Sequence, residues 1–489
     1  MDGYSEVIGA TLAHCPRAAQ CSPLAAPRAP TGITTRVTLP FQARLTTQDP
    51  VVECRRIALR GRNPGAVLRS GDRKGILEGP TPSDQNRILT THVGSLVRPL
   101  KLVTFLEEVE EGRPYDKSAY AACLQECIAE VVQQQAEAGV DIVSDGEFGK
   151  TENWPWYIHQ RISGFTERPS TPEEAMDPLA TMSQGRGFVD FPGFYAEYFP
   201  TQGFRVRPGS LTTVCNGPIR YIGQALVQRD IANIKAAAAK VKVEDAFLPL
   251  VAPASAFPFY KNEYYKDDET LLLLLALAEA RREEYESVLD AGLRIQIDDA
   301  FLPWTYERMV PPKNLSEYRK WAELRIDALN HALDGLPQER IRYHVCWGSW
   351  NAPHIHDVPL KDIVDLLLKL RVGGYQFEAP NVRHEHEWRV WQTVKVPAGR
   401  VLIPGVISHA TNVVEHPELV ADRLVCFASI VGRENVVAGT DCGFAQGPFT
   451  RRVHPTIPWG ETPRPSRGRE DRDPTAMGQS FSRIVRARW

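Results

Sequence analysis

The chain lacks the features that mark membrane-spanning and nucleic-acid-binding proteins. Its longest apolar run covers residues 271–278 of 489, whereas a membrane-spanning helix needs roughly 18 apolar residues. The formal net charge is −3, so there is no basic excess to neutralise phosphate groups. These absences argue against a membrane or a nucleic acid as a partner, and the composition is that of a soluble globular protein.

Cysteine is present, but not in the pattern of a disulfide framework. The nine cysteines are odd in number and scattered along the chain, whereas small secreted proteins carry dense, even-numbered sets. This usage fits a reducing compartment, so we expect a cytoplasmic protein.

Both ends of the chain lack a folding pattern. Residues 1–86 are rich in proline, alanine, arginine and threonine, with no sustained helical or strand period, and we expect a low-order N-terminal extension. Between Ala10 and Gln48 there is no acidic residue, which leaves mitochondrial targeting as an alternative. Residues 460–489 are polar, proline-rich and aperiodic, and we expect an irregular tail.

The part between the two ends repeats one unit. An amphipathic helix is predicted at 117–138, Gly139 ends it, and an apolar strand with terminal acids follows. Helices at 271–291, 360–372 and 417–431 repeat this order, and further strands fit at 211–217, 246–253, 340–346 and 401–408. Alternating strands and helices predict an α/β protein, a (β/α)8 TIM barrel over residues 87–459. A doubly wound open sheet is the alternative, but its usual G-x-G-x-x-G turn is missing.

A long aromatic-rich insertion, residues 151–210, is predicted after the second strand. Two interpretations are open, a cover over the mouth of the barrel or a surface subdomain with its own small core. Its aromatic residues are Trp154, Trp156, Tyr157, Phe188, Phe191, Phe194, Tyr195, Tyr198 and Phe199.

Polar and acidic residues collect where the predicted strands end. The carboxyl ends of parallel barrel strands form one rim, and active sites of such barrels lie there. Five strand ends each offer residues suited to metal binding or acid/base chemistry: Asp145 and Glu147; Asp298 and Asp299; His344 and Cys346; Glu378; Asp441 and Cys442.

Four of these residues make a plausible zinc site. His344 and Cys346 are two apart on one strand, so their side chains share a face. Glu378 and Cys442 would add a carboxylate and a second thiolate from other strands. Two thiolates and a carboxylate give the zinc complex a net negative charge, which damps its Lewis acidity. Such a site suits the activation of a substrate thiol, and the chemistry it predicts is thiol alkylation.

The motifs at the strand ends also carry a family resemblance. They are TTHVGS (90–95), SDGEF (144–148), IQIDDA (295–300), HVC (344–346), FEAPN (377–381), PGVISHATNVVEHPE (404–418) and GTDCG (439–443). In these, residues 87–459 resemble the catalytic barrel of cobalamin-independent methionine synthases and their archaeal-type single-barrel relatives, a barrel type shared with uroporphyrinogen decarboxylase. The resemblance implies an enzyme that uses Zn²⁺ to transfer a methyl group to a small thiol, homocysteine, giving methionine.

The resemblance also implies roles for single residues. It places the zinc ligands at His344, Cys346, Glu378 and Cys442. It places His409, one position from an ungapped match to the family's general acid, in the catalytic machinery, together with Asp298. It implies that homocysteine is bound by a backbone turn and two free acids, which here are Val93, Gly94, Ser95, Glu147 and Asp298.

Two departures from the family leave the methyl donor open. The family's pterin-binding tryptophan follows its third strand, and we expect that place at residues 216–224, which hold no tryptophan. Residues 1–86 are too unpatterned to form the second barrel that helps to hold folate. The methyl donor is therefore either a methyl-folate or a methyl-corrinoid. The alternative is a different reaction, in which an epoxide alkylates a coenzyme M-like thiol. A non-catalytic truncated paralogue is the alternative from another class.

Overall fold

The computed structural model describes residues 87–152, 156–176, 185–201, 211–256, 260–265, 269–349, 351–445, 447–449 and 453–457. The predictions for residues 1–86 and 460–489 fall outside this part of the chain. Within it, no helix is both long and apolar enough to cross a membrane.

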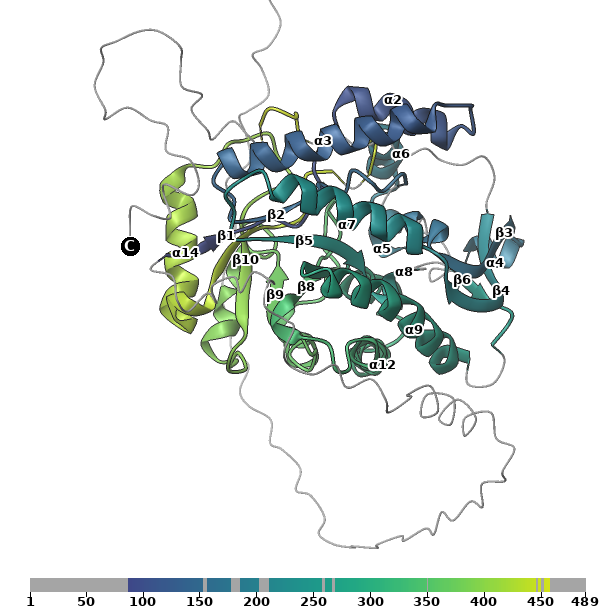
Figure 1. Cartoon of the computed structure of the whole chain (residues 1–489). Helices are drawn as coiled ribbons and strands as arrows, with labels where there is room; N and C mark the ends of the chain where they lie inside the picture. The colour runs from purple at the N-terminus through teal and green to yellow at the C-terminus, as the bar shows by residue number, and fades with distance from the viewer. Residues whose placement is uncertain are drawn as a thin grey trace, which may run out of the picture. The chain divides into compact units, whose positions relative to one another are not determined.

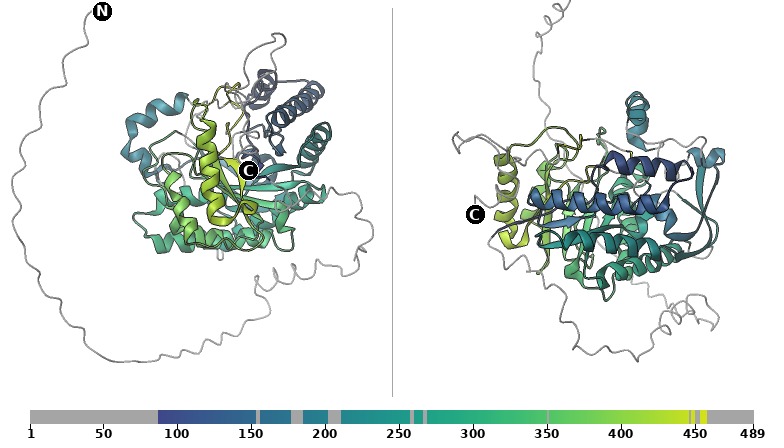
Figure 2. Two further views of the ribbon diagram at one scale, coloured as in Figure 1. Left: turned by 90° about the vertical axis from the view of Figure 1, so that its left-hand side faces the viewer. Right: turned by 45° about the horizontal axis from the view of Figure 1, so that its top comes forward.

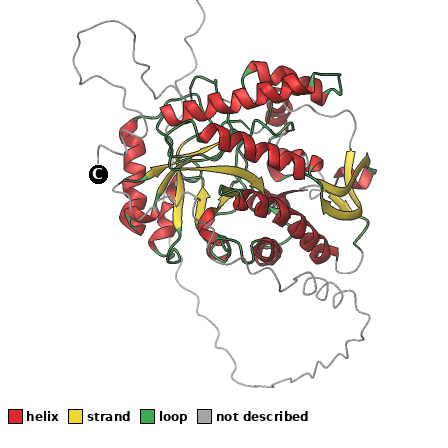
Figure 3. Ribbon diagram, viewed as in Figure 1, coloured by secondary structure: helices red, strands yellow, loops and turns green. Residues whose placement is uncertain are grey.

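Eight parallel strands form the centre of the molecule (Figures 1 and 3). Their order in the sheet is β1-β11-β10-β9-β8-β7-β5-β2, so each strand lies beside its neighbours in chain order. The strands are β1 (Leu89–Thr90), β2 (Ile142–Ser144), β5 (Asp245–Val251), β7 (Arg294–Asp299), β8 (Ile341–Val345), β9 (Gly374–Phe377), β10 (Val401–Ile407) and β11 (Val437–Thr440).

The two end strands of the sheet nearly close it into a barrel. The Asp141 amide donates to the Thr90 carbonyl at 3.1 Å, and the Thr91 hydroxyl donates to the Ile142 carbonyl at 3.0 Å. These bonds join the start of β2 to the end of β1. The prediction of an α/β, TIM-type barrel is therefore confirmed.

Helices cover the outside of the strands. In the left view of Figure 2 the colours pass around the strands in chain order, from the blue of α3 to the yellow-green of α14. The longer helices are α2 (Leu100–Glu110), α3 (Lys117–Glu137), α7 (Gln224–Ala238), α9 (Glu269–Asp290), α12 (Leu315–Ala332) and α14 (Pro417–Val431). The shorter ones between barrel strands are α8 (Pro253–Ala256), α10 (Phe301–Trp304), α11 (Tyr306–Met309), η4 (Gln338–Arg340), η5 (Leu360–Asp362), α13 (Val364–Leu367), η6 (Glu385–Gln392) and η7 (Arg433–Asn435).

The predicted helices agree with the structure at three of four places. Those at 117–138, 271–291 and 417–431 correspond to α3, α9 and α14. The helix predicted at 360–372 is wrong, because only η5 and the four-residue α13 form there. The Lys369 and Leu370 amides bond three residues back rather than four. Tight turns therefore bury the same apolar side chains that suggested a continuous helix.

Three of the longer helices, α2, α7 and α12, are absent from the sequence-based prediction. The start of α12 does carry a recognisable signal. Asn314 accepts from the Glu317 amide at 3.1 Å, and the Glu317 carboxylate accepts from the Asn314 amide at 3.0 Å. This capping box satisfies two donors at the helix N-terminus.

The insertion after β2 contributes a small second sheet, visible at the right of Figure 1. Two of its strands, β3 (Ile162–Pro169) and β4 (Leu211–Tyr221), lie between β2 and β5, and the third, β6 (Tyr260–Asn262), comes from the segment after β5. The strand predicted at 211–217 does form, but as β4 it pairs with β3 and β6, not with the barrel strands. The insertion also contains η2 (Trp156–Gln160), α4 (Pro172–Met176), α5 (Arg186–Asp190) and α6 (Pro192–Thr201).

This pairing corrects the place assigned to the family's tryptophan. Residues 216–224 follow no barrel strand, because the third barrel strand is β5. The stretch that follows β5 is 252–259, which also holds no tryptophan. Its last three residues, 257–259, lie outside the described part of the chain.

Helices α5 and α6 contact a loop at the carboxyl rim of the barrel. The Tyr198 hydroxyl accepts from the Asn351 amide, after β8, at 2.8 Å. Asp190 accepts from the His356 imidazole of the same loop at 2.5 Å. Tyr195 is buried and stacks on Phe188 at 3.9 Å between ring centroids. The aromatic segment therefore has packing of its own and also reaches the rim; Trp154 lies outside the described residues.

The inside of the barrel is layered. Its floor is an apolar cluster of Leu89, Ile142, Phe247, Ile403 and Val437. Above it the Arg342 guanidinium lies 3.7 Å over the Phe247 ring and donates to the Thr91 hydroxyl and the His92 carbonyl at 2.8 and 2.7 Å. Two residues further along β8 comes His344, so the strand passes from the apolar floor through a polar layer to the site.

Candidate metal and thiol site

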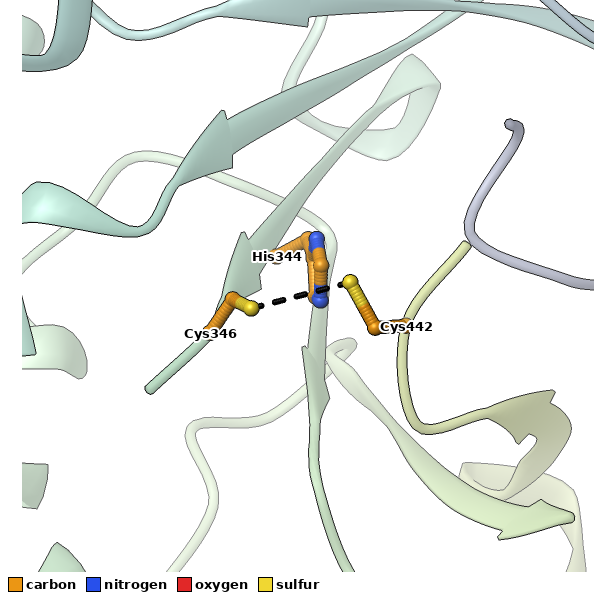
Figure 4. A group of neighbouring side chains, drawn as sticks. All are labelled: His344, Cys346 and Cys442. Atoms are coloured by element: carbon orange, nitrogen blue, oxygen red, sulfur yellow. Dashed lines mark hydrogen bonds between the residues drawn. The ribbon is translucent and has the colours of Figure 1, made fainter. Parts of the chain in front are cut away.

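Three predicted ligands meet at the carboxyl ends of β8 and β11. His344 lies on β8, Cys346 follows directly after β8, and Cys442 follows β11 (Figure 4). All three side chains are buried, and their ligand atoms lie within 4.8 Å of one another. Within the described residues, they are the one group of His, Cys, Asp or Glu side chains found to converge in this way.

The spacing of the two sulfurs fits a metal site. The Sγ atoms of Cys346 and Cys442 are 3.6 Å apart, much farther than the roughly 2.05 Å of a disulfide. Two sulfurs on one tetrahedral Zn²⁺, each at about 2.3 Å, would lie about 3.8 Å apart. Two thiols and an imidazole at this spacing can hold a metal ion.

The contact between the two sulfurs changes the pKa of both thiols. The hydrogen bond to Cys442, with burial, raises the pKa of the Cys346 thiol. The hydrogen bond from Cys346, assisted by nearby His344, lowers the pKa of the Cys442 thiol. The shared proton therefore lets one sulfur of the pair ionise more easily than the other, and a thiolate is the form that binds metal.

Asp298 orients the histidine of the cluster. Its Oδ1 lies 2.9 Å from Nδ1 of His344 and accepts from the Gln296 side-chain Nε2 at 2.7 Å. Burial works against the imidazolium, but the bond to Asp298 raises the pKa of His344. With Nδ1 as the donor, Nε2 can act as the ligand, which is the usual carboxylate–histidine–metal arrangement.

We expect Asp298→Asn to weaken metal binding by roughly 10- to 100-fold, because the carboxylate that orients His344 and raises its basicity is lost. A competitive titration with a zinc chelator measures this affinity. Asp299→Asn is the matched control, because Asp299 instead accepts from Ser255 and Tyr343. Equal zinc affinity in Asp298→Asn and the unchanged protein would contradict the assignment.

Glu378, the predicted fourth ligand, lies beside the cluster rather than in it. Its Oε1 accepts from the Trp347 amide at 2.9 Å, and its Oε2 accepts from the Asn381 side chain at 2.8 Å. Both oxygens of this buried carboxylate are thus hydrogen-bonded, and the compact group of three does not include it.

The predicted Val93–Gly94–Ser95 turn borders the cluster. Val93 packs against Cys346 and Cys442. Two amides of the turn are already used, since Val93 donates to the Thr440 hydroxyl and Gly94 to the His92 ring. The Ser95 hydroxyl, in contrast, is buried without a partner. Ser95 Oγ is therefore a polar group of this turn that is available to bind a ligand.

Glu147 is strained and is not the free acid that was expected. It has a φ of 61°, a left-handed conformation that costs a non-glycine residue about 1–2 kcal/mol. One carboxylate oxygen pairs with the Lys150 ammonium at 2.5 Å. Lys150 also donates to the Pro249 carbonyl at 2.9 Å, and it was missed by the sequence reasoning although it lies three residues from Glu147.

His409 lies on the loop after β10 and is buried. Its Nε2 is 3.1 Å from the Ser349 carbonyl, on the loop that leaves Cys346. The adjacent Ala410 carbonyl accepts from the Asn351 side chain at 2.6 Å. These bonds tie the loops after β8 and β10 together; the role of His409 as a general acid stays a prediction.

A buried histidine beside the site was also missed. His384 lies between two carboxylates, 2.9 Å from Glu387 and 3.2 Å from Asp357, and its ring is 4.4 Å from that of Trp347. Burial alone would lower the pKa of His384, but the bonds to Asp357 and Glu387 raise it to about 10. Its sequence signal, His-Glu-His-Glu over 384–387, does not reveal which of these residues becomes buried.

The raised pKa of His384 predicts a pH-dependent contribution to stability. The contribution is fully present below the unfolded-state pKa of about 6.5 and is lost as the pH rises towards 10. We expect His384→Gln to be less stable than the unchanged protein at pH 6, by an amount that shrinks by roughly 2–4 kcal/mol at pH 9.5. Urea unfolding at both pH values measures the difference. A gap that stays constant would contradict a charged His384.

No family model matches the chain, but two curated proteins resemble it over most of its length. It is 24% identical to 2-hydroxypropyl-CoM lyase of Xanthobacter autotrophicus, over 65% of this chain and 79% of that protein. It is also 24% identical to methionine synthase of Sulfolobus acidocaldarius, over 74% of this chain and 87% of that protein.

A solved structure agrees with the fold. The B12-independent methionine synthase of Shewanella sp. W3-18-1, in complex with selenomethionine, superposes with a TM-score of 0.55 at 18% identity. The match covers 76% of this chain and 94% of that one.

Proposed function

Because the chain belongs to the cobalamin-independent methionine synthase family, we propose that it transfers a methyl group to the thiol of homocysteine with the help of Zn²⁺. The observation that carries the proposal is the convergence of His344, Cys346 and Cys442 at the carboxyl rim of the barrel. When bound there, zinc lowers the pKa of a substrate thiol and leaves it nucleophilic.

His344, Cys346 and Cys442 would hold the metal, and Glu378 would be its exchangeable ligand. The carboxylate is the hardest of the four donors and would be the weakest ligand for a borderline-soft metal, so it is the one that a substrate sulfur would replace. Glu378 already has hydrogen-bond partners away from the cluster. It can leave the metal without becoming an unsatisfied buried charge.

The acceptor's amino acid group would lie between the turn and the two acids. Ser95 Oγ is a buried donor without a partner, suited to the substrate carboxylate. Asp298 and Glu147 would face the substrate ammonium, each with one oxygen already engaged, by His344 and Lys150 respectively. The strained backbone of Glu147 fits a residue held in place for binding.

The transfer balances as follows. The acceptor thiol releases its proton to solvent, and its sulfur forms the S–CH₃ bond as the bond between the methyl group and the donor breaks. The donor leaves with the electron pair of that bond. His409 would supply a proton to the leaving group from the loop after β10.

The direct test is turnover by the zinc-loaded chain. Homocysteine would be supplied with methyl-folate in one assay and methyl-corrinoid in another, and methionine would be measured. We expect methionine with one donor and none after zinc is removed by a chelator. Purified chain that holds no zinc, or that forms no methionine with either donor, would refute the proposal.

Lys150 favours a second candidate, alkyl transfer to an anionic thiol that lacks an ammonium group. Its own ammonium already pairs with Glu147 and is buried, so the subsite has less need of a substrate ammonium. The Xanthobacter relative is named for a coenzyme M derivative. Comparing homocysteine with 4-mercaptobutyrate, its analogue without the amino group, separates the candidates: tenfold tighter binding of the analogue would favour the second.

A further inference from the structure

Asn381 connects two buried acids of the site through a single amide group. Its Nδ2 donates to Glu378 Oε2 at 2.8 Å and to Asp441 Oδ2 at 3.0 Å. An amide nitrogen has two hydrogens, so both are used. Asn381 therefore links the predicted exchangeable ligand to the residue directly before Cys442.

The orientation of this amide is fixed by its other end. Oδ1 of Asn381 accepts from the Arg383 and His384 backbone amides at 3.0 and 3.1 Å. A flipped side chain would place its NH₂ group against two N–H donors and its oxygen against two carboxylates. The donor end must therefore face Glu378 and Asp441.

The acid beside Glu378 is equally constrained. Asp441 is completely buried, and its second oxygen accepts from the Ala379 amide at 2.9 Å. Gly405 of β10 packs so closely on it that a Cβ there would lie 2.4 Å from Oδ1. Asp441 cannot move away, so Asn381 is held between a fixed acid and Glu378.

We propose that Asn381 is a positioning residue that keeps the Glu378 carboxylate beside the metal-binding cluster and so reserves a place for the acceptor thiol. This inference rests on the proposed function. The hydrogen bonds from Asn381 and the Trp347 amide stabilise the carboxylate away from the metal. Without Asn381, Glu378 binds the metal more strongly and competes with the incoming sulfur.

The test measures thiol binding rather than turnover. The full chain is loaded with Co²⁺, whose absorption changes when a sulfur ligand binds, and is titrated with homocysteine. We expect Asn381→Ala to raise the Kd for the thiol about tenfold, the effect of one charge-assisted hydrogen bond. Arg383→Ala, an exposed side chain on the same turn, is the control and should leave the Kd unchanged.

A double-mutant cycle separates positioning from general damage. If Asn381 acts through Glu378, its removal has no effect on the thiol Kd in a Glu378→Gln background. If Asn381→Ala fails to fold, Asn381→Ser, which keeps one donor, replaces it in the cycle. An unchanged Kd in the single variant, or an equal loss in both backgrounds, overturns the inference alone. Failure of the unchanged chain to bind Co²⁺ or thiol overturns the proposed function with it.

Discussion

Replacing either cysteine of the cluster, Cys346→Ser or Cys442→Ser, is expected to abolish zinc retention and all thiol transfer. Each cysteine supplies one of the two sulfurs that lie 3.6 Å apart. A serine hydroxyl does not ionise at neutral pH and is a poor zinc ligand. Zinc binding of about 10–16 kcal/mol spread over four ligands gives each roughly 3 kcal/mol, so affinity should fall at least 100-fold.

Metal analysis after gel filtration in a weak chelator gives the measurement. The unchanged chain should retain one zinc, and both variants should retain almost none. Cys426→Ser is the control, because Cys426 lies on α14, away from the group of three. Full zinc content in both cluster variants would show that the metal, if present, is bound elsewhere.

The cluster could be predicted because strand geometry alone brings it together. Side chains two residues apart in an extended chain share a face. His344 on β8 and Cys346 just after it therefore had to point the same way. Parallel strands all end at one rim, so Cys442 after β11 had to arrive near them. Neither step depends on side-chain conformation, which is why residues nearly 100 positions apart could be matched from the sequence.

The partners of the site residues could not be predicted in the same way. Glu378 also follows a barrel strand, but its distance from the metal cluster depends on which donors capture its oxygens, and Asn381 lies in an irregular turn. Lys150 pairs with Glu147, whose backbone is left-handed. Such contacts depend on turn conformation and rotamers, on which periodicity carries no information.

The pairing of β4 shows a second limit. Its apolar alternation correctly predicted a strand at 211–217, but alternation does not say which strand lies next to it. In the structure β4 pairs with the antiparallel strand β3 of the preceding insertion. The third strand of the barrel is therefore β5 and not β4. The number of strands counted from the sequence therefore predicted the right fold, although one of the counted strands, β4, belongs to another sheet.

The insertion is joined to the barrel by a buried ionic network, and breaking it is expected to cost about 3–5 kcal/mol of stability. Arg161, after η2, donates to Glu284 of α9 and, at 2.6 Å, to Asp230 of α7. Arg281 also pairs with Glu284, which is completely buried. In Glu284→Ala, two buried guanidinium groups lose their shared carboxylate.

Urea unfolding of Glu284→Ala at pH 7 measures this loss. Glu286→Ala on the same helix is the control, because its pair with Arg282 is partly exposed and worth at most about 1 kcal/mol. Burial works against the Glu284 carboxylate, but Arg281 and Arg161 lower its pKa. Its contribution is therefore present above the unfolded-state pKa of about 4.3 and is lost as the pH falls below it. Equal losses in the two variants would contradict a buried network.

Glu284→Ala should also weaken binding at the acceptor subsite. The Arg161 guanidinium lies 5.2 Å from the centre of the Tyr157 ring, and the Lys150 ammonium lies 4.3 Å from it. Lys150 in turn holds Glu147. If this stack positions the subsite, Glu284→Ala weakens homocysteine binding at temperatures where the chain is still folded, while zinc content stays at that of the unchanged protein. Loss of zinc content together with loss of homocysteine binding would instead indicate global unfolding. The reason is that β8 and β11, which position the predicted metal ligands, take no part in this network.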